Sequence, residues 1–267
     1  MTQSADSQQN NGTFTIELAG ATIAITALHD DVRNLCRDYI VPRTTADIAI
    51  ATAQADIEFE HSRTDEEFSD GYLETLAVYR KIAAAMAARD TFLMHGSVLA
   101  VGNEAYMFTA PSGTGKTTHS RLWLSGIPGS YIVNGDKPLI TISEQNNAAG
   151  AKIGAQTDAQ PSTRFAAIAH GTPWCGKEGW NTKTSVPLKA IVILERGEEN
   201  SITEISAIEA YPAIYPQIHR PADIPTAKQV LDLSGKLLES VRCYRLTCNM
   251  DPEAAFVAYN GLKTDRK

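Results

Sequence analysis

The chain has 267 residues, of which 43% are hydrophobic and 21% are charged, and its formal net charge is −7. This composition excludes bulk disorder, and the overall acidity argues against a nucleic-acid partner, because binding a phosphate backbone needs a large basic surface. No apolar run approaches the ~18 residues of a membrane-spanning helix, so no membrane partner is expected.

The N-terminal third predicts a short disordered tail at 1–12 and a small α/β subdomain at 13–90. The tail is polar and lacks the positive and apolar regions of a secretory signal, which favours a cytoplasmic protein. Alternating apolar residues predict strands at 14–18, 23–25, 48–50 and 57–59. Apolar stripes with helical spacing predict helices at 30–39 and 69–89.

Residues 91–267 predict a second α/β domain. Its strands are expected at 92–101, 104–109, 131–133, 139–142, 188–194 and 243–247. Its helices are expected at 116–125, 226–241 and 251–262. The stretch before the strand at 188–194 is rich in loop signals, and no internal repeat is present.

The segment from Ala110 to Thr117 matches the phosphate-loop motif G-x-x-x-x-G-K-[ST], with Ala110 in place of the first glycine. Its glycines allow backbone N–H groups to converge on a phosphate chain, Lys116 can reach the β and γ oxygens, and the Thr117 hydroxyl can bind Mg²⁺. The motif follows a predicted strand and opens a predicted helix, whose N-terminus attracts anions. Nucleotide contacts are expected from Ser112, Gly113, Thr114, Gly115, Lys116, Thr117 and Thr118. The alternative is a glycine-rich turn that carries a surface lysine.

The charge is unevenly distributed along the chain. Between Ala110 and Arg196, nine Lys and Arg residues stand against five Asp and Glu residues. A basic middle in an acidic chain suits a small anionic ligand held in a pocket better than a long polyanion.

Two segments beside the motif carry a resemblance to a known family. Met94-His95-Gly96-Ser97 precedes the motif by one hairpin, and Asn134-Gly135-Asp136-Lys137 follows the next strand. This order resembles the HPr kinase and phosphoenolpyruvate carboxykinase superfamily, in which a His-bearing strand, a phosphate loop and an Asp-Asp turn form one nucleotide and metal site. The segment 181–188 is similar to an Asn-Thr-Arg-x-Ser-Tyr-Pro segment of the carboxykinases. The resemblance implies a P-loop domain with a mixed sheet over 91–267, and also a homo-oligomer, since HPr kinases form oligomers.

The resemblance implies a role for each matching residue. Lys116 would lie on the transferred phosphate, and Thr117 on the nucleotide-bound Mg²⁺ or Mn²⁺. Asp136 would match the second aspartate of the pair, a metal ligand, and His95 the histidine beside that metal. Thr117, Asp136 and His95 are therefore the expected metal ligands.

Two positions depart from the family pattern. Gly135 stands where the first aspartate, the catalytic base of HPr kinases, belongs, so that base is missing or comes from elsewhere. Lys183 replaces an arginine that steadies the γ-phosphate in the carboxykinases, which keeps the charge but loses the bidentate geometry.

The stretch 172–180 holds two Trp, two Gly, a Lys and a Cys and predicts an irregular loop, typical of a segment that closes over a ligand. With Lys177 and Lys183 it is expected to form the acceptor side of the active site. The alternatives are a surface loop anchored by its tryptophans, a core role for His95 and a purely local turn role for Asp136. The four cysteines form no CxxC pair, so neither a zinc module nor a disulfide framework is expected.

These observations favour an ATP-dependent kinase that passes the γ-phosphoryl group to an alcohol, either a serine-like metabolite or a seryl side chain. A nucleotide-binding regulatory module without turnover is one alternative, because the first aspartate is absent. A decarboxylating phosphotransferase of the carboxykinase type is another, although the chain is short and poor in arginines between the motif and Lys183. The sequence leaves the acceptor and the oligomeric state open.

Overall fold

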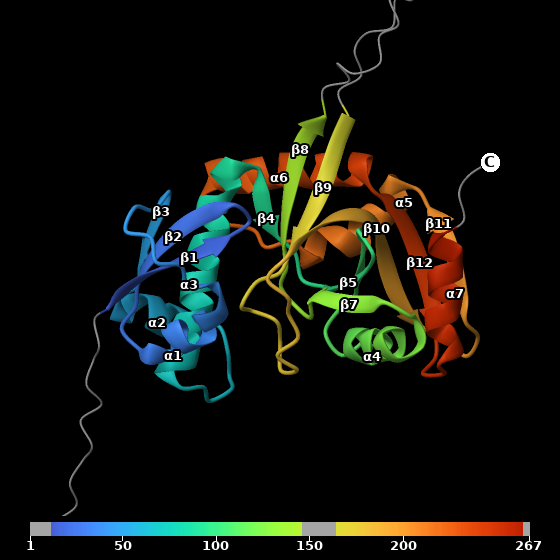
Figure 1. Cartoon of the computed structure of the whole chain (residues 1–267), viewed down its shortest axis with the longest axis horizontal. Coiled ribbons are helices and arrows are strands. Elements are labelled where there is room, and N and C mark those ends of the chain that lie inside the picture. The colour runs from blue at the N-terminus through green and yellow to red at the C-terminus, as the bar shows by residue number, and fades with distance from the viewer. Residues whose placement is uncertain (1–11, 146–163, 264–267) are drawn as a thin grey trace, which may run out of the picture. The chain divides into compact units, whose positions relative to one another are not determined.

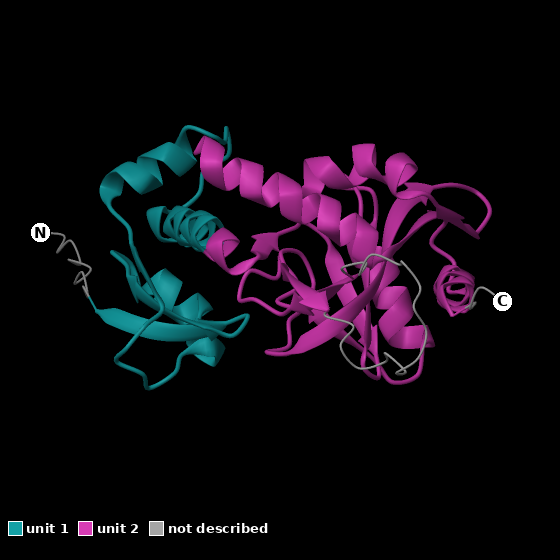
Figure 2. Cartoon of the chain, turned by 90° about the horizontal axis from the view of Figure 1, so that it is seen from above, with its two compact units in different colours: residues 1–85 teal, residues 86–267 magenta. Residues whose placement is uncertain are grey.

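The computed structural model describes residues 12–145 and 164–263. The chain divides into two compact units, residues 1–85 (unit 1) and residues 86–267 (unit 2), which are coloured separately in Figure 2. Each unit combines a β-sheet with α-helices, which confirms the expected α/β class. The tail expected at 1–12 lies, apart from Gly12, outside the described residues. In the described ranges, no helix has both the length and the apolar character needed to cross a bilayer.

Unit 1 contains a three-stranded sheet in the order β1-β2-β3. An antiparallel hairpin provides the first two strands, and the third lies parallel to β2. The strands are β1 (Thr13–Leu18), β2 (Ala21–Thr26) and β3 (Ile48–Ala51). The helices are α1 (Asp30–Leu35), the short 3-10 helix η1 (Arg37–Tyr39), α2 (Gln54–His61) and α3 (Asp70–Met86). The alternating residues Ile16, Ile23 and Ile25 are fully buried, as expected for a hairpin with one face on a core.

The prediction of a strand at 57–59 is wrong, because these residues lie inside α2. The Asp56 side chain accepts a hydrogen bond of 2.9 Å from the N-cap amide and closes the first turn of the helix. Ile57 and Glu60, three residues apart, face inward, and Glu60 accepts a 2.7 Å hydrogen bond from Arg80 of α3. A run of three alternating residues fits either a strand or a helical stripe, so the contact with α3 decides the outcome.

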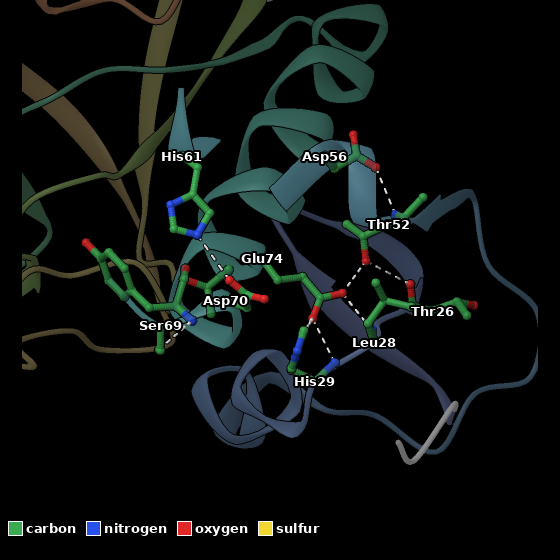
Figure 3. Close-up of polar contacts among 12 residues, drawn as sticks. Thr26, Leu28, His29, Thr52, Asp56, His61, Ser69, Asp70 and Glu74 are labelled. Carbon is green, nitrogen blue, oxygen red and sulfur yellow. Dashed lines mark hydrogen bonds and ion pairs between the residues drawn. The ribbon is translucent and has the colours of Figure 1, made fainter. Parts of the chain in front are cut away.

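A buried carboxylate joins three parts of unit 1 (Figure 3). Glu74 of α3 has no exposed surface, and it accepts hydrogen bonds from the amides of Leu28 at 2.6 Å and His29 at 2.7 Å. The His29 ring Nδ1 lies 2.9 Å from the same carboxylate, and the Thr52 hydroxyl donates to its other oxygen. A carboxylate away from water is tolerated only with such partners. Glu74 therefore fixes α3 to the segments that follow β2 and β3.

Unit 2 is built on a nine-stranded mixed sheet (Figure 1). Its main path follows the order β4-β8-β9-β10-β6-β5-β7, and β12 pairs with both β10 and β11. The long strand β10 is antiparallel to β9 over its first residues, parallel to β6 from Leu188 and parallel to β12 from Ala190. The strands are β4 (Thr91–Leu93), β5 (Ser97–Val101), β6 (Glu104–Thr109), β7 (Ser130–Asn134), β8 (Leu139–Gln145), β9 (Arg164–His170), β10 (Ser185–Arg196), β11 (Ser201–Ile205) and β12 (Arg242–Cys248).

Helices cover both faces of this sheet. Met107 and Ile191 pack in one core cluster with residues of α5 and α6, whereas Phe108 and Val192 pack in a second cluster with residues of α4 and α7. Successive residues of a strand point to opposite faces, so the two pairs of helices lie on opposite sides. The helices are η2 (Ala87–Arg89), α4 (Lys116–Gly126), α5 (Ala207–Ile214), η3 (Tyr215–Gln217), α6 (Ile224–Ser240) and α7 (Glu253–Leu262).

The strand predicted at 92–101 is in fact two strands, β4 and β5, with a turn between them. In that turn the His95 amide donates to the Gln217 carbonyl at 2.7 Å, and the Gly96 amide donates to the Asp136 carbonyl at 2.8 Å. The main chain leaves the sheet here because its amides donate to these two carbonyls, which are distant in sequence, and not to a neighbouring strand. The break places the His95 side chain outside the strand.

Four elements of unit 2 were not predicted: β9, β11, α5 and η3. β9 lies in the segment expected to be rich in loops, where its alanines weaken the alternation of apolar and polar residues. α5 carried a readable signal, a capping box. The Ser206 amide donates to the Glu209 carboxylate at 2.9 Å, and the Glu209 amide donates to the Ser206 hydroxyl at 3.3 Å.

Candidate functional site

The segment Ala110–Lys116, here termed the glycine loop, connects the end of β6 to the start of α4. Gly113 has a φ of 79° and Gly115 a φ of 127°, in the region that favours glycine. A Cβ added to either glycine would meet no atom within 4 Å, so space is open beside both of them. Within the described residues, no carbonyl accepts a hydrogen bond from the amides of Gly115, Lys116 or Thr117. The loop and the first turn of α4 thus present unused donors, the feature on which anion binding depends.

Lys116 lies at the base of the glycine loop, and its side chain is largely buried. Its Nζ donates to the carbonyl oxygens of Ala110 at 2.9 Å and Pro111 at 3.3 Å. Burial lowers the pKa of Lys116, and the negative charge of Asp136 partly opposes that shift. The ammonium group and the Asp136 carboxylate are therefore close enough to interact.

The alanine at position 110 has a structural explanation. Ala110 is buried at 2% exposure and packs in the same core cluster as Phe108 and Trp123. It is not among the described residues that have a positive φ. The position needs no glycine, so the departure from the motif leaves the loop conformation intact.

His95 and Asp136 come from two different turns and contact each other. The His95 Nε2 lies 3.2 Å from the Asp136 Oδ1, and the His95 Nδ1 lies 2.8 Å from the Gln217 Oε1. The Thr109 hydroxyl donates to the His95 carbonyl at 2.9 Å, which ties this turn to the last residue of β6, directly before the glycine loop. His95 therefore has positioned partners on both ring nitrogens, and its backbone lies beside the C-terminal end of β6.

The Asp136 carboxylate is held in its charged form. Burial raises the pKa of Asp136, but the hydrogen bond from His95 and the positive charges of Lys137, His95 and Lys116 outweigh burial, so the pKa lies below its usual value. A carboxylate with a low pKa is a good cation ligand and a weak general base.

The turn that carries Asp136 is built by Asn134. The Asn134 Oδ1 accepts hydrogen bonds from the amides of Asp136 at 2.9 Å and Lys137 at 2.7 Å. Its Nδ2 donates to the carbonyl and the hydroxyl of Thr172, both at 3.0 Å. The Asp136 carboxylate takes no part in these bonds, so a purely local turn role does not account for it.

Gly135 could not hold the aspartate that the resemblance leads one to expect. A Cβ at this position would lie 2.8 Å from the Cys175 carbonyl oxygen and 3.3 Å from the Trp180 carbonyl oxygen. The Gly135 amide also donates to that Trp180 oxygen at 2.8 Å. Close backbone approach therefore requires glycine here, and the segment at 172–180 occupies the space of a side chain.

The segment Thr172–Trp180, here termed the tryptophan loop, packs against the turn at Asp136. Trp174 is buried at 5% exposure. Gly176 has a φ of 80°, and a Cβ added to it would lie 3.2 Å from the Asp136 Cβ. The loop thus forms one wall beside the Asp136 side chain.

The tryptophan loop is also linked to α4. The Arg121 Nη2 lies 2.8 Å from the Glu178 Oε2, and the Arg121 guanidinium lies 5.7 Å from the centre of the Trp180 ring. Arg121 stands on the helix that begins at the glycine loop. These contacts hold the tryptophan loop between the Asp136 turn and α4.

Lys177 and Lys183 are both exposed. Lys177 directly follows Gly176, and Lys183 follows Thr182, whose amide donates to the Val133 carbonyl at 3.1 Å. The backbone of both lysines therefore runs beside the turn at Asp136. Their role toward an acceptor stays a prediction.

Cys175 is a poor candidate for a nucleophile. Burial raises the pKa of its thiol, and the Asn181 amide donates to its sulfur at 3.1 Å without reversing that shift. A thiol with a raised pKa is mostly protonated at neutral pH, so it has little nucleophilic character. All four cysteines of the chain are free thiols.

The donor set fits a divalent cation that is shared with a nucleotide. Among the described residues, no group of three or more His, Cys, Asp and Glu side chains gathers into an all-protein metal site. Asp136 and His95 form a pair, and Thr117 is exposed on the first turn of α4. Mg²⁺ in nucleotide sites takes few protein ligands and completes its shell with phosphates and waters.

Arg196 is a site residue that the sequence did not reveal. Its guanidinium donates to the carbonyls of Gly113 and Thr114, with an Nε to Thr114 oxygen distance of 3.0 Å. β10 is parallel to β6, with Ile193 opposite Thr109, so the end of β10 lies beside the glycine loop. The only sequence signal is a basic residue at the end of a buried strand. The pairing that brings it to the loop is a property of the fold.

Neither a scan against models of known protein families nor a search of curated proteins found a match for this chain. The interpretation of the site therefore depends on its own residues and geometry.

Proposed function

We propose that the chain is an ATP-dependent kinase that transfers the γ-phosphoryl group to an alcohol acceptor in the presence of Mg²⁺. One observation carries the proposal: the glycine loop offers unused amides and a buried lysine, and the contacting pair of His95 and Asp136 is tied by the Thr109 hydroxyl to the last residue before that loop. Donors for phosphate and a ligand for a cation thus occur together, as phosphoryl transfer requires. The order of these parts along the chain also resembles that of the HPr kinases and the carboxykinases.

The chemistry needs positioning and charge neutralisation more than covalent participation by the protein. Lys116 would place its charge against the phosphates, because a phosphate oxygen can replace the carbonyls that it now contacts. Thr117, Asp136 and His95 would hold the Mg²⁺, which neutralises phosphate charge when bound. The low pKa of Asp136 keeps this ligand charged near neutral pH.

The tryptophan loop is the best candidate for the acceptor side. It lies against Asp136 and is held to α4 by Arg121. Transfer to an alcohol competes with transfer to water, so a wall that excludes solvent beside the phosphates favours the alcohol. Lys177 and Lys183 extend from and beyond this loop and could pair with an anionic group of the acceptor.

A second function is favoured by one specific observation. The close approach of Cys175 and Trp180 leaves no room for a carboxylate at position 135, and Asp136 is a weak base. A nucleotide-binding regulatory module needs no base and would keep the rest of the site. Turnover therefore has to be measured separately from binding.

The first experiment follows ADP formation and phosphoryl transfer from labelled ATP with Mg²⁺, using a panel of hydroxy compounds that includes free serine and seryl peptides. Lys116→Ala should abolish transfer and weaken ATP binding by about ten-fold or more, since a charge-assisted contact is worth roughly 1.5–3 kcal/mol. Lys189→Ala is the matched control, because Lys189 is exposed and pairs only loosely with Glu104, at 3.7 Å, at the opposite end of β6. Unchanged binding and turnover in Lys116→Ala would refute both functions.

The second experiment tests the cation site. Asp136→Asn should raise the Mg²⁺ or Mn²⁺ concentration needed for half-maximal transfer, because the amide has lost the charge that attracts the cation. The turn itself should persist, since Asn134 builds it. ATP binding without transfer to any acceptor, in a protein whose binding depends on Lys116, would favour the regulatory module over the kinase.

A further inference from the structure

We propose that Arg196 is a positioning residue of the glycine loop: it holds the carbonyls of Gly113 and Thr114 to one side, so that the Gly115 amide is directed at the phosphate chain of a nucleotide. This inference rests on the proposed nucleotide site and identifies a residue, outside the motif, that prepares it. The observation behind it is the pair of hydrogen bonds from one guanidinium to two successive loop carbonyls.

The geometry of the peptide bond links these carbonyls to the donors. The Thr114 carbonyl and the Gly115 N–H belong to the same peptide plane, and in a trans peptide they point in opposite directions. None of the peptide bonds in the described part of the chain is cis. A hydrogen bond that holds the Thr114 oxygen toward Arg196 therefore directs the Gly115 N–H away from Arg196, where no described carbonyl accepts it.

The other bonds of the loop act on its first half, apart from that of the Gly115 carbonyl, which accepts from the His119 amide of α4 at 2.9 Å. The Thr114 hydroxyl donates to the Pro111 carbonyl at 2.9 Å, and the Lys116 ammonium donates to the carbonyls of Ala110 and Pro111. The second half contains both glycines, whose backbones have the widest conformational freedom in the unbound state. Among the described residues, Arg196 supplies the contacts that hold the carbonyls of Gly113 and Thr114, and it does so from a strand of the sheet.

The choice of arginine is explained by the two acceptors. The guanidinium is a planar fork with several donors, which can satisfy two neighbouring oxygens at once, whereas a lysine ammonium acts as a point charge on a flexible stem. Arg196 itself is exposed, so its contribution comes from orienting the loop and not from a buried charge. Its removal should therefore weaken nucleotide binding more than it lowers the stability of unit 2.

The test compares Arg196→Gln with Arg245→Gln. Arg245 stands on the neighbouring strand β12, is also exposed, and pairs with Glu195 at 3.0 Å, with no contact to the glycine loop among the described residues. Dissociation constants for MgATP and MgADP are measured by equilibrium dialysis, and amide hydrogen exchange of the loop peptide is measured without nucleotide. We expect Arg196→Gln to weaken binding about ten-fold and to speed exchange in the loop, and Arg245→Gln to change neither by more than about two-fold. Thermal unfolding should be similar for the two variants.

The outcomes separate this inference from the proposed function. If Lys116→Ala loses nucleotide binding while Arg196→Gln binds as the parent does, the role of Arg196 is wrong and the nucleotide site stands. If Arg245→Gln weakens binding as much as Arg196→Gln does, the effect is one of general charge and the inference also fails. If the parent binds no nucleotide, both proposals fail. Arg196→Lys replaces Arg196→Gln if the latter does not fold, and here too parental affinity and exchange would overturn the inference.

Discussion

The close approach at Gly135 makes a specific prediction for stability. In Gly135→Ala, the new Cβ would lie 2.8 Å from the Cys175 carbonyl oxygen and 3.3 Å from the Trp180 carbonyl oxygen. Both are backbone atoms, so relief requires the tryptophan loop to move. That movement would stretch the 2.8 Å hydrogen bond between the Gly135 amide and the Trp180 oxygen.

The expected cost follows from these two effects. Forcing extra atoms into a packed site costs about 1–3 kcal/mol, and weakening one backbone hydrogen bond falls within that range. For a cooperative unit of about 150–250 residues, each kcal/mol lowers the melting temperature by about 2–4 °C, so unit 2 should melt about 2–12 °C earlier. Nucleotide-dependent activity should fall as well, because the displaced loop lies against Asp136.

The matched control is Gly235→Ala, in the middle of α6. A Cβ there meets no atom within 4 Å, and Gly235 is not among the glycines with a positive φ. Alanine has the higher helix propensity, so this variant should gain up to about 1 kcal/mol. Differential scanning calorimetry of the full chain measures both variants. A Gly135→Ala protein that melts with or above the parent would show that the tryptophan loop does not pack on the turn as described.

Three further predictions concern other parts of the chain. Glu74→Gln should lower the free energy of unfolding by about 2–4 kcal/mol, because an amide nitrogen would then face the N–H donors that now bind a buried carboxylate. In a urea titration, unit 1 should unfold at a lower urea concentration, and an unchanged midpoint would contradict the role of this network. The folded-state pKa of Asp136 lies below its usual value of 3.8, so its stabilising effect is present above about pH 4 and is lost as the pH falls through the folded pKa. The difference in unfolding free energy between the parent and Asp136→Asn should accordingly be largest near neutral pH and shrink in acid, and a constant difference from pH 7 to pH 3 would be evidence against it. Lys177→Ala and Lys183→Ala should each depress transfer to the acceptor while leaving ATP affinity largely intact, and parental turnover in both would make them solvated surface charges.

Local sequence signals were sufficient where one segment determines its own conformation. The glycine loop could be located from its motif, because glycines in left-handed conformations followed by a lysine at the start of a helix form a local pattern. The hairpin β1–β2 and the long helices α3 and α6 were likewise visible in the periodicity of their apolar residues. The failure at 57–59 shows the limit, since three residues cannot distinguish the two periodicities.

The tertiary structure alone decided which distant residues share the site. The sequence could propose His95 and Asp136 by resemblance, but the contact between them depends on a turn that interrupts the predicted strand. The amides of that turn donate to the carbonyls of Gln217 and Asp136. The need for glycine at position 135 arises from the tryptophan loop, which lies some forty residues further along the chain. Arg196 reaches the glycine loop only because β10 pairs in parallel with β6. Local propensity acts over a few residues, whereas strand pairing and close packing join segments far apart in sequence. The sequence alone thus determined the donor loop, and the arrangement of side chains around it was decided by the pairing of the sheet.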